Sequence, residues 1–202
     1  MKLFISPGAC SLSPHIALRE AGLPFTTELV DLRTKRTAGG ADFSAINPKG
    51  YVPALQLDDG SLLTEGPAIV QYIADRAPER ALAPAAGTLA RYRLAEWLNF
   101  ISSEVHKAYG PLFNPASGED MKSAARAALA KRFTYINAEL ATRDYLVGGQ
   151  FSVADGYLFT VTNWAGHVAV PLEGFSALQA FQDRVGARPM VQQALRDEGL
   201  IP

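Results

Sequence analysis

The sequence predicts an α/β domain followed by an all-α domain. In the first 80 residues, strand-like alternation and Gly/Pro turn signals are interleaved with helical periodicity, whereas the remainder shows helical periodicity alone. Between them, Arg80 to Thr88 is rich in Ala, Pro and Gly and has no periodicity, as in a linker. We therefore expect one domain over residues 1–80 and a helical bundle over residues 88–202.

The first elements form a β-α-β unit. Lys2 to Ser6 reads as a short strand, Ser11 to Gly22 as a helix with Pro14 in its first turn, and Phe25 to Leu32 alternates with the period of a strand. A helical crossover of this kind joins parallel strands. The chain therefore begins with a parallel pair.

A hairpin and a helix complete the predicted first domain. Val52 to Leu57 and Ser61 to Leu63 read as strands joined by a turn at Asp58-Asp59-Gly60. Glu65 to Ala77 has apolar residues at helical spacing, and Pro78 ends this helix.

The second domain is predicted to contain helices alone. Ser152-Val153-Ala154-Asp155 has the spacing of a capping box, to which we assign a structural role. The expected helices cover residues 89–109, 121–140, 152–165, 178–185 and 191–196.

Composition narrows the class of protein. Nineteen Lys and Arg against twenty Asp and Glu give a net charge of −1, which offers no electrostatic support for nucleic-acid binding. The chain shows no secretory core and no apolar stretch near the ~20 residues that span a membrane, so we expect a cytoplasmic protein. One cysteine excludes an internal disulfide, and its spacing from the three histidines predicts no metal.

Tyr51-Val52-Pro53 and Thr64-Glu65-Gly66 predict one site for a small extended peptide. Pro53 opens a strand, where it is either a trans edge proline or the second residue of a cis bond. A cis bond would turn the Val52 N–H and C=O outward to pair with a peptide. Glu65 could bind the ligand's ammonium beside a helix start that attracts its carboxylate, or could simply complement the helix dipole.

Cys10 lies at the start of the first predicted helix. Helix N-termini lower thiol pKa values, so Cys10 is either a reactive thiolate or a small buried hydrophobe. Farther along, Asn99, Ser103 and His106 have the spacing of one polar helix stripe, which either serves a site or faces water. His106 can hold or move a proton near neutral pH, whereas His15 is interpreted as structural.

Over essentially its whole length the chain resembles the glutathione transferases, above all the bacterial beta class. The resemblance rests on an ordered set of motifs rather than on any one of them: Pro7-Gly8-Ala9-Cys10-Ser11, Asn47-Pro48-Lys49-Gly50, Val52-Pro53, Thr64-Glu65-Gly66, Glu104-Val105-His106-Lys107 and Phe151-Ser152-Val153-Ala154-Asp155. It implies a thioredoxin-like domain, a helical domain and a homodimer.

The resemblance also implies a role for each site residue. Val52, before a cis Pro53, would hold the cysteinyl backbone of glutathione, Lys35 its glycine carboxylate, and Glu65 and Gly66 its γ-glutamyl end. Cys10, Ser11 and His106 would lie beside the glutathione sulfur as the catalytic residues, with Glu104 reaching over from the partner subunit. The remaining glutathione contacts would be Ala9, Tyr51, Asn99, Ser103 and Lys107, and the co-substrate pocket would contain Tyr109, Phe113, Trp164 and His167.

Two residues depart from the related patterns. Ile5 stands where tyrosine is frequent, so no tyrosine hydroxyl at that position activates the thiol. Gly66 stands where many other transferase classes have serine, which leaves backbone N–H alone to hold the γ-glutamyl carboxylate.

The leading functional hypothesis is conjugation of reduced glutathione to hydrophobic electrophiles through a stabilised thiolate, as in detoxification. A second hypothesis is glutathione-dependent reduction or dehalogenation through a Cys10 mixed disulfide. A third is a non-catalytic ligand carrier with the same fold. Neither the electrophile nor the pathway follows from the sequence.

Overall fold

The computed structural model describes residues 1–202, which divide into two units. The first unit contains Met1–Ala83 together with Arg188–Pro202, and the second contains Pro84–Ala187. The division falls inside the expected linker. The helical domain predicted over residues 88–202 is shorter in the structure, because Arg188–Pro202 belong to the first unit.

A five-stranded mixed sheet forms the centre of the first unit, in the order β3-β2-β1-β4-β5. The parallel pairing of β1 with β2 confirms the predicted β-α-β unit, and the antiparallel β4 and β5 confirm the hairpin, with Gly60 at φ 85° in its turn. The strands are β1 (Lys2–Ile5), β2 (Thr26–Asp31), β3 (Arg36–Thr37), β4 (Ala54–Gln56) and β5 (Leu62–Thr64).

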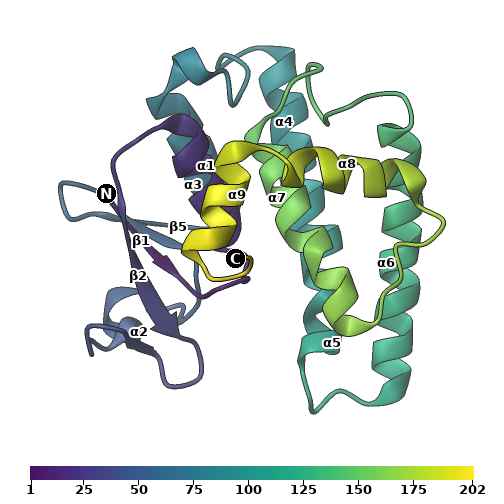
Figure 1. Cartoon of the computed structure of the whole chain (residues 1–202). Coiled ribbons are helices and arrows are strands. Elements are labelled where there is room, and N and C mark those ends of the chain that lie inside the picture. The colour runs from purple at the N-terminus through teal and green to yellow at the C-terminus, as the bar shows by residue number, and fades with distance from the viewer. The chain divides into compact units, whose positions relative to one another are not determined.

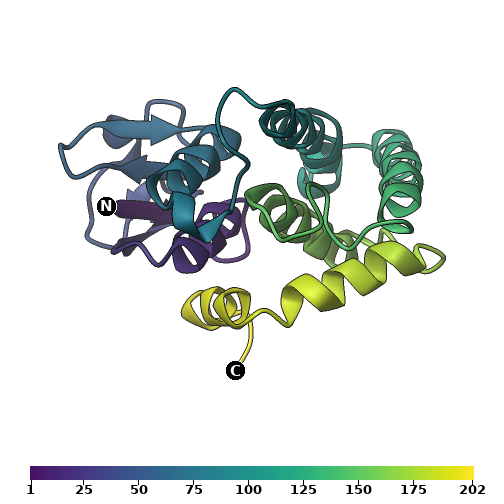
Figure 2. The same ribbon diagram turned by 90° about the horizontal axis from the view of Figure 1, so that it is seen from above.

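Helices α1 (Leu12–Ala21), α3 (Gly66–Arg76) and α9 (Pro189–Asp197) belong to the same unit. The predicted ends of α1 and α3 are confirmed: Gly22 caps α1 at φ 67°, and α3 stops just before Ala77-Pro78, where the short 3-10 helix η1 (Pro78–Arg80) begins. Helix α1 contacts both α3 and α9, so the C-terminal helix lies beside the first helix of the chain (Figures 1 and 2).

Strand β1 is buried on both faces of the sheet, and its successive side chains point to opposite faces. Leu3 and Ile5 are buried on one face of β1, and Phe4 on the other packs against Phe43 of α2 (Phe43–Ile46), with ring centroids 5.5 Å apart. Val52 belongs to this second cluster, which places the predicted peptide-binding segment directly on the core. Helix α2 and strand β3 were not predicted.

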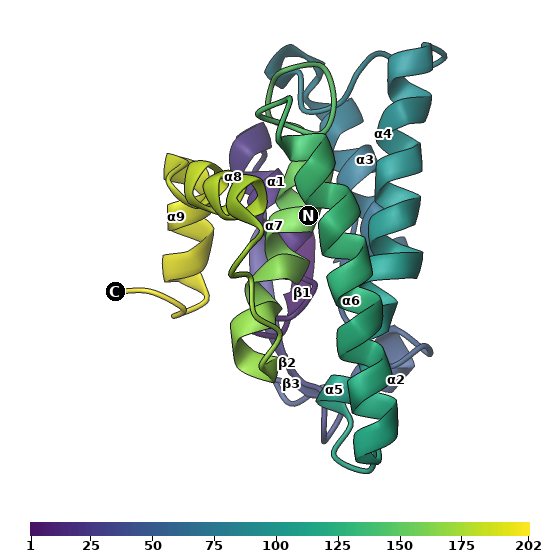
Figure 3. The ribbon, with the colours of Figure 1, turned by 90° about the vertical axis from the view of Figure 1, so that its right-hand side faces the viewer.

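The second unit is helical, as predicted, and α4 and α6 run side by side within it (Figure 3). The single helix expected over residues 89–109 is wrong in detail, because the chain changes from α-helix to a π turn and then to a 3-10 turn. The elements are α4 (Leu89–Phe100), η2 (Ile101–His106), η3 (Lys107–Tyr109), α5 (Gly110–Phe113), α6 (Glu119–Leu140), α7 (Val153–Thr162), η4 (Asn163–Val168) and α8 (Ser176–Gly186).

Helix α7 is fixed at its start by the buried carboxylate of Asp155. One carboxylate oxygen accepts the backbone N–H of Ser152 at 2.8 Å and its hydroxyl at 2.7 Å, and the other accepts the Leu146 N–H at 2.8 Å. Burial raises the pKa of Asp155 to about 6, although these hydrogen bonds lower it. The predicted capping box is therefore present, and every residue of α7 is buried.

None of the helices combines the length and the apolar character needed to cross a bilayer.

Candidate functional site

Cys10 occupies the loop that leads into α1, one residue before the N-cap Ser11. Its thiol donates to the Val52 carbonyl oxygen at 3.2 Å, which joins the loop to the predicted peptide-binding segment. Burial raises the pKa of the Cys10 thiol to about 11, outweighing the backbone N–H groups of Cys10 and Ser11 that lower it. Of the two alternatives that the sequence left open for Cys10, the raised pKa therefore favours a buried, protonated thiol over a thiolate.

Ser11 serves the geometry of this loop. Its hydroxyl accepts the N–H of Ser6 at 3.1 Å and donates to the Ser6 carbonyl at 3.2 Å. The Ser11 hydroxyl therefore acts as both donor and acceptor to Ser6, and these two bonds close the turn that contains Cys10.

The Val52-Pro53 bond is cis, which decides between the two alternatives left open by the sequence. The preceding Tyr51 carbonyl accepts the side-chain amide of Asn47 at 2.8 Å, so the segment is held from outside the sheet. Val52 and Pro53 are both buried, whereas Tyr51 is exposed.

Glu65 is the acidic group of the predicted clamp, and its carboxylate already binds a cation. Lys49 Nζ lies 2.6 Å from Glu65 Oε1, and the Tyr51 hydroxyl donates to the same oxygen at 2.8 Å. Glu65 is the N-cap residue of α3, and its side chain makes no capping bond there. An exposed carboxylate that pairs with an ammonium is suited to a ligand's amino group.

Gly66 and Lys35 both lie near the segment of residues 50–53: a Cβ at Gly66 would lie 3.8 Å from the Pro53 ring, and Lys35 bonds to Gly50. Gly66 is the first residue of α3 and Pro67 the second, so of these two residues only Gly66 has a backbone N–H to offer an anion. Lys35 has φ 56°, and its ammonium donates to the Gly50 carbonyl at 2.7 Å. Gly66 and Lys35 therefore both lie close to the segment that contains Tyr51.

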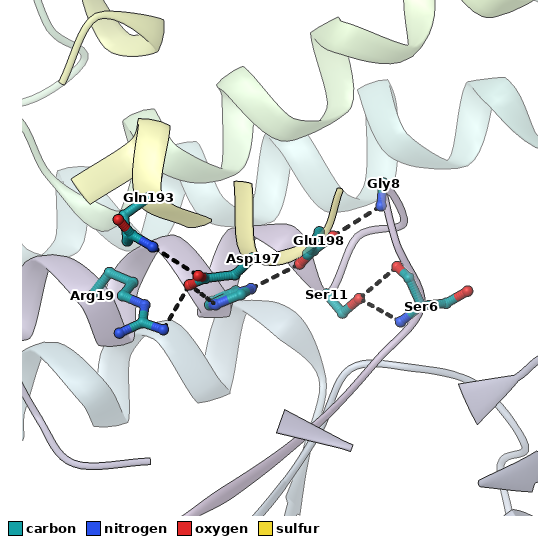
Figure 4. Close-up of polar contacts among 8 residues, drawn as sticks. Ser6, Gly8, Ser11, Arg19, Gln193, Asp197 and Glu198 are labelled. Carbon is teal, nitrogen blue, oxygen red and sulfur yellow. Dashed lines mark hydrogen bonds and ion pairs between the residues drawn. The ribbon is translucent and has the colours of Figure 1, made fainter. Parts of the chain in front are cut away.

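A buried carboxylate that the sequence analysis missed ties the Cys10 loop to the C-terminus (Figure 4). Glu198 accepts the backbone N–H of Gly8 at 2.9 Å with one oxygen and lies 2.9 Å from His15 Nδ1 with the other. Next to it, Asp197 pairs with Arg19 at 2.6 Å. His15 is completely buried, which fits its predicted structural role. The sequence signal for Glu198 was weak, because one Glu near a chain end looks like ordinary surface charge.

The predicted site residues of the helical unit form an aromatic cluster around His106. Its ring lies 4.9 Å from that of Trp164, and its Nδ1 is 2.7 Å from the hydroxyl oxygen of Tyr157. Tyr109 and Phe113 also pack edge-on against Trp164, at 5.3 and 5.5 Å. Burial, with the nearby Lys107 charge, lowers the pKa of His106 to about 4. His106 is therefore a neutral imidazole at physiological pH.

Two residues of the predicted polar stripe, Asn99 and Ser103, are exposed, and the Ser103 hydroxyl donates to the Asn99 carbonyl at 2.9 Å. The third, His106, ends the π turn and contacts Tyr157 of α7.

Three other predicted residues lie on the periphery of the helical unit. Glu104 is bound by the guanidinium of Arg132 at 2.5 Å, and Lys107 and His167 are exposed. Of the predicted co-substrate residues, His167 alone is absent from the rings that pack around Trp164.

A separate pocket of about 660 Å³ opens between α4 and α6. Trp97 stacks on Tyr135 with ring centroids 5.8 Å apart, and Phe100 meets the same tyrosine edge-on. Two arginines and two glutamates complete its lining: Arg93, Arg143, Glu96 and Glu139.

No group of three or more His, Cys, Asp or Glu side chains is arranged as a metal site.

The sheet, the cis proline and the helical unit define the class to which the chain belongs. Residues 8–76 match the N-terminal domain of glutathione S-transferases, and residues 100–189 match the C-terminal domain. The chain belongs to the glutathione S-transferase family.

Three similar proteins of matching length are bacterial glutathione S-transferases. Glutathione S-transferase GstA of Escherichia coli O157:H7 is 51% identical over 200 residues, covering 99% of this chain and 100% of the relative. Among solved structures, a bacterial beta class glutathione S-transferase from Sphingomonas chungbukensis and a sphingomonad glutathione S-transferase complexed with glutathione are each 50% identical. Each match covers both chains completely, with a TM-score of 0.97.

The raised pKa of Cys10 predicts slow alkylation at neutral pH. In the ligand-free protein roughly one thiol in a thousand should be ionised at pH 8, so the iodoacetamide rate should rise about tenfold per pH unit up to pH 10. Stopped-flow alkylation measures this profile, with free N-acetylcysteine as a control that levels off near its own pKa. A rate that levels off below pH 8 would show that the helix start dominates after all.

Proposed function

We propose that this protein conjugates reduced glutathione to small hydrophobic electrophiles. The observation that carries the proposal is the arrangement of Val52, whose carbonyl accepts the Cys10 thiol, together with Glu65 and Gly66 at the start of α3. An extended backbone can pair with Val52, while the carboxylate and the free helix amide suit the two charges of an amino-acid end. The glutathione complex of the sphingomonad relative supports the same ligand.

In the chemical step the glutathione thiolate attacks an electrophilic carbon and forms a carbon–sulfur bond. With an activated aryl chloride, the carbon–chlorine bond then breaks and chloride leaves with the bonding electron pair. The backbone N–H groups of Cys10 and Ser11 already favour negative charge on the Cys10 sulfur, and the same amides can stabilise a ligand thiolate beside it. Lys35 is proposed to bind the glycine carboxylate. Remaining proposed contacts are those of Ala9, Tyr51, Asn99, Ser103, Glu104, His106 and Lys107, and the aromatic cluster of Tyr109, Phe113 and Trp164 is proposed to bind the co-substrate.

We further propose that the enzyme acts in detoxification in the cytoplasm. The free thiol of Cys10 and the use of reduced glutathione fit a reducing compartment.

Removing the Cys10 sulfur tests the conjugation mechanism. Because this thiol is protonated, Cys10→Ala should keep conjugation of glutathione to an activated aryl chloride within about fivefold of wild type. Retention on immobilised glutathione provides the matching binding assay. The proposal fails if the wild-type protein neither binds the resin nor forms the aryl conjugate, and a hundredfold loss in Cys10→Ala would instead make Cys10 the nucleophile.

Adding a hydroxyl at position 66 should strengthen the binding of the γ-glutamyl carboxylate of glutathione. A Cβ at Gly66 would have the Pro53 ring as its nearest neighbour at 3.8 Å, an ordinary contact, so serine fits. One additional hydrogen bond to a charged group contributes about 1.5 kcal/mol, so Gly66→Ser should lower the KM for glutathione by roughly tenfold. Steady-state kinetics measures the change, and Gly66→Ala controls for the added methyl group. Equal KM values for the two variants would contradict the expected contact.

We propose that two copies of the chain pair through the pocket between α4 and α6. The pocket combines an exposed tyrosine at its aromatic centre with two positive and two negative side chains, and such a surface can pair with its own copy. Leu89 and Tyr92 extend the apolar face, with exposed fractions of 72% and 66%.

A carboxylate placed in this pocket should separate the subunits. Tyr135→Glu should shift the mass measured by light scattering from dimer to monomer, because a charge would be buried against Trp97. Met121→Glu, on the same helix but outside the pocket, should remain dimeric. A dimeric Tyr135→Glu protein would place the interface elsewhere.

A further inference from the structure

The imidazole of His106 is held by one short hydrogen bond inside the helical unit. His106 ends the π turn, and Tyr157 lies near the middle of α7. The 2.7 Å between Nδ1 and the tyrosine hydroxyl oxygen joins two elements that are 51 residues apart in sequence. The proposed conjugation mechanism gives His106 a place near the thiol but gives Tyr157 no part.

The acidity of the two groups indicates which one donates. A phenol is much more acidic than the N–H of neutral imidazole, and an unprotonated ring nitrogen is a stronger acceptor than a phenol oxygen. The bond between them is therefore assigned with Tyr157 donating to Nδ1 of His106.

The protonation state of the ring then fixes its second nitrogen. Burial keeps His106 neutral, since its pKa is lowered to about 4. A neutral imidazole carries one proton, so a ring that accepts at Nδ1 must carry that proton on Nε2. His106 in this form is an uncharged hydrogen-bond donor that cannot act as a base through Nε2.

Both partners are held in place by buried or paired groups. Asp155, two residues before Tyr157, fixes the start of α7, and Tyr157 itself is only 3% exposed. On the other side, Arg132 binds Glu104 of the π turn through Nε at 3.1 Å and through Nη2 at 2.5 Å. The Tyr157 hydroxyl therefore bonds to the His106 ring, and the π turn that carries this ring is itself held by Arg132.

We propose that Tyr157 is a positioning residue that holds His106 in the Nε2–H tautomer, so that the imidazole donates a hydrogen bond to an anionic sulfur rather than accepting a proton from a thiol. This inference rests on the proposed function, because the anion it concerns is the thiolate of glutathione. In such a site the tyrosine determines whether the histidine stabilises negative charge or removes a proton.

The tautomer can be read directly by NMR of ¹⁵N-histidine-labelled protein at pH 7. Long-range ¹H–¹⁵N correlation should show Nδ1 of His106 as an unprotonated ring nitrogen and Nε2 as a protonated one. His106→Asn removes this signal set and so assigns it among the three histidines. This wild-type measurement needs no variant of Tyr157, and a protonated Nδ1 would overturn the proposal.

Tyr157→Phe then removes the hydroxyl while keeping the ring. Both nitrogen shifts of His106 should move toward the averaged values of a tautomer mixture. Tyr109→Phe is the matched control, because Tyr109 is a fully buried tyrosine of the same cluster whose hydroxyl has no hydrogen-bond partner in the protein. It should leave the His106 shifts unchanged. Unchanged shifts in Tyr157→Phe, or equal changes in both variants, would refute a role for the hydroxyl.

Kinetics connects the tautomer to the reaction. Loss of a fixed donor should lower kcat for conjugation roughly threefold to tenfold in Tyr157→Phe, with the KM for glutathione changed less. An unaltered kcat beside altered nitrogen shifts would show that the tautomer does not serve catalysis and would overturn the positioning role. If the wild-type protein had no conjugating activity, the proposed function would fail, while the NMR result would still report on the hydrogen bond itself.

Discussion

The geometry of the first unit depends on a buried carboxylate at the far end of the chain. Glu198 has a fully buried side chain, and its two oxygens are satisfied by the Gly8 N–H and by His15. Burying a carboxylate is unfavourable unless it is paired, so both partners and the helix that carries His15 must stay in register with α9. The turn that presents Cys10 contains Gly8, and this interaction therefore fixes the sulfur and the start of α1 together.

Local signals in the sequence were sufficient for most of the fold. Gly22 and Pro78 marked helix ends because their backbone restrictions act within one or two residues, and Asp59-Gly60 marked the hairpin for the same reason. Strand β3 escaped prediction because two residues carry no periodicity. The π turn escaped it because the Leu89–Tyr109 segment keeps an apolar pattern compatible with an uninterrupted α-helix.

The sequence predicted which residues form the candidate site but not the protonation states of those residues. The sequence named Cys10, Glu65 and His106, yet the pKa values of Cys10 and His106 are set chiefly by burial, which depends on residues brought together from distant segments. For Cys10 the expected effect of the helix start had the right sign but was the smaller contribution. The partners Glu198 and Tyr157 were missed because they lie 183 and 51 residues from the histidines they contact.

The place of α9 in the first unit has a consequence for the order in which the protein can fold. Residues Met1–Ala83 leave the ribosome before the second unit, but the carboxylate that binds His15 and the Gly8 N–H belongs to residues made after that unit. Until Arg188–Pro202 has been synthesised, His15 lacks its buried partner and one side of α1 lacks the helix that covers it. The second unit, Pro84–Ala187, is contiguous in sequence, so its folding does not depend on the synthesis of a later segment. The second unit can therefore complete its fold before the first unit does. The contact between Glu198 and the Gly8 turn, which completes the candidate site in the first unit, also closes the longest loop of the chain.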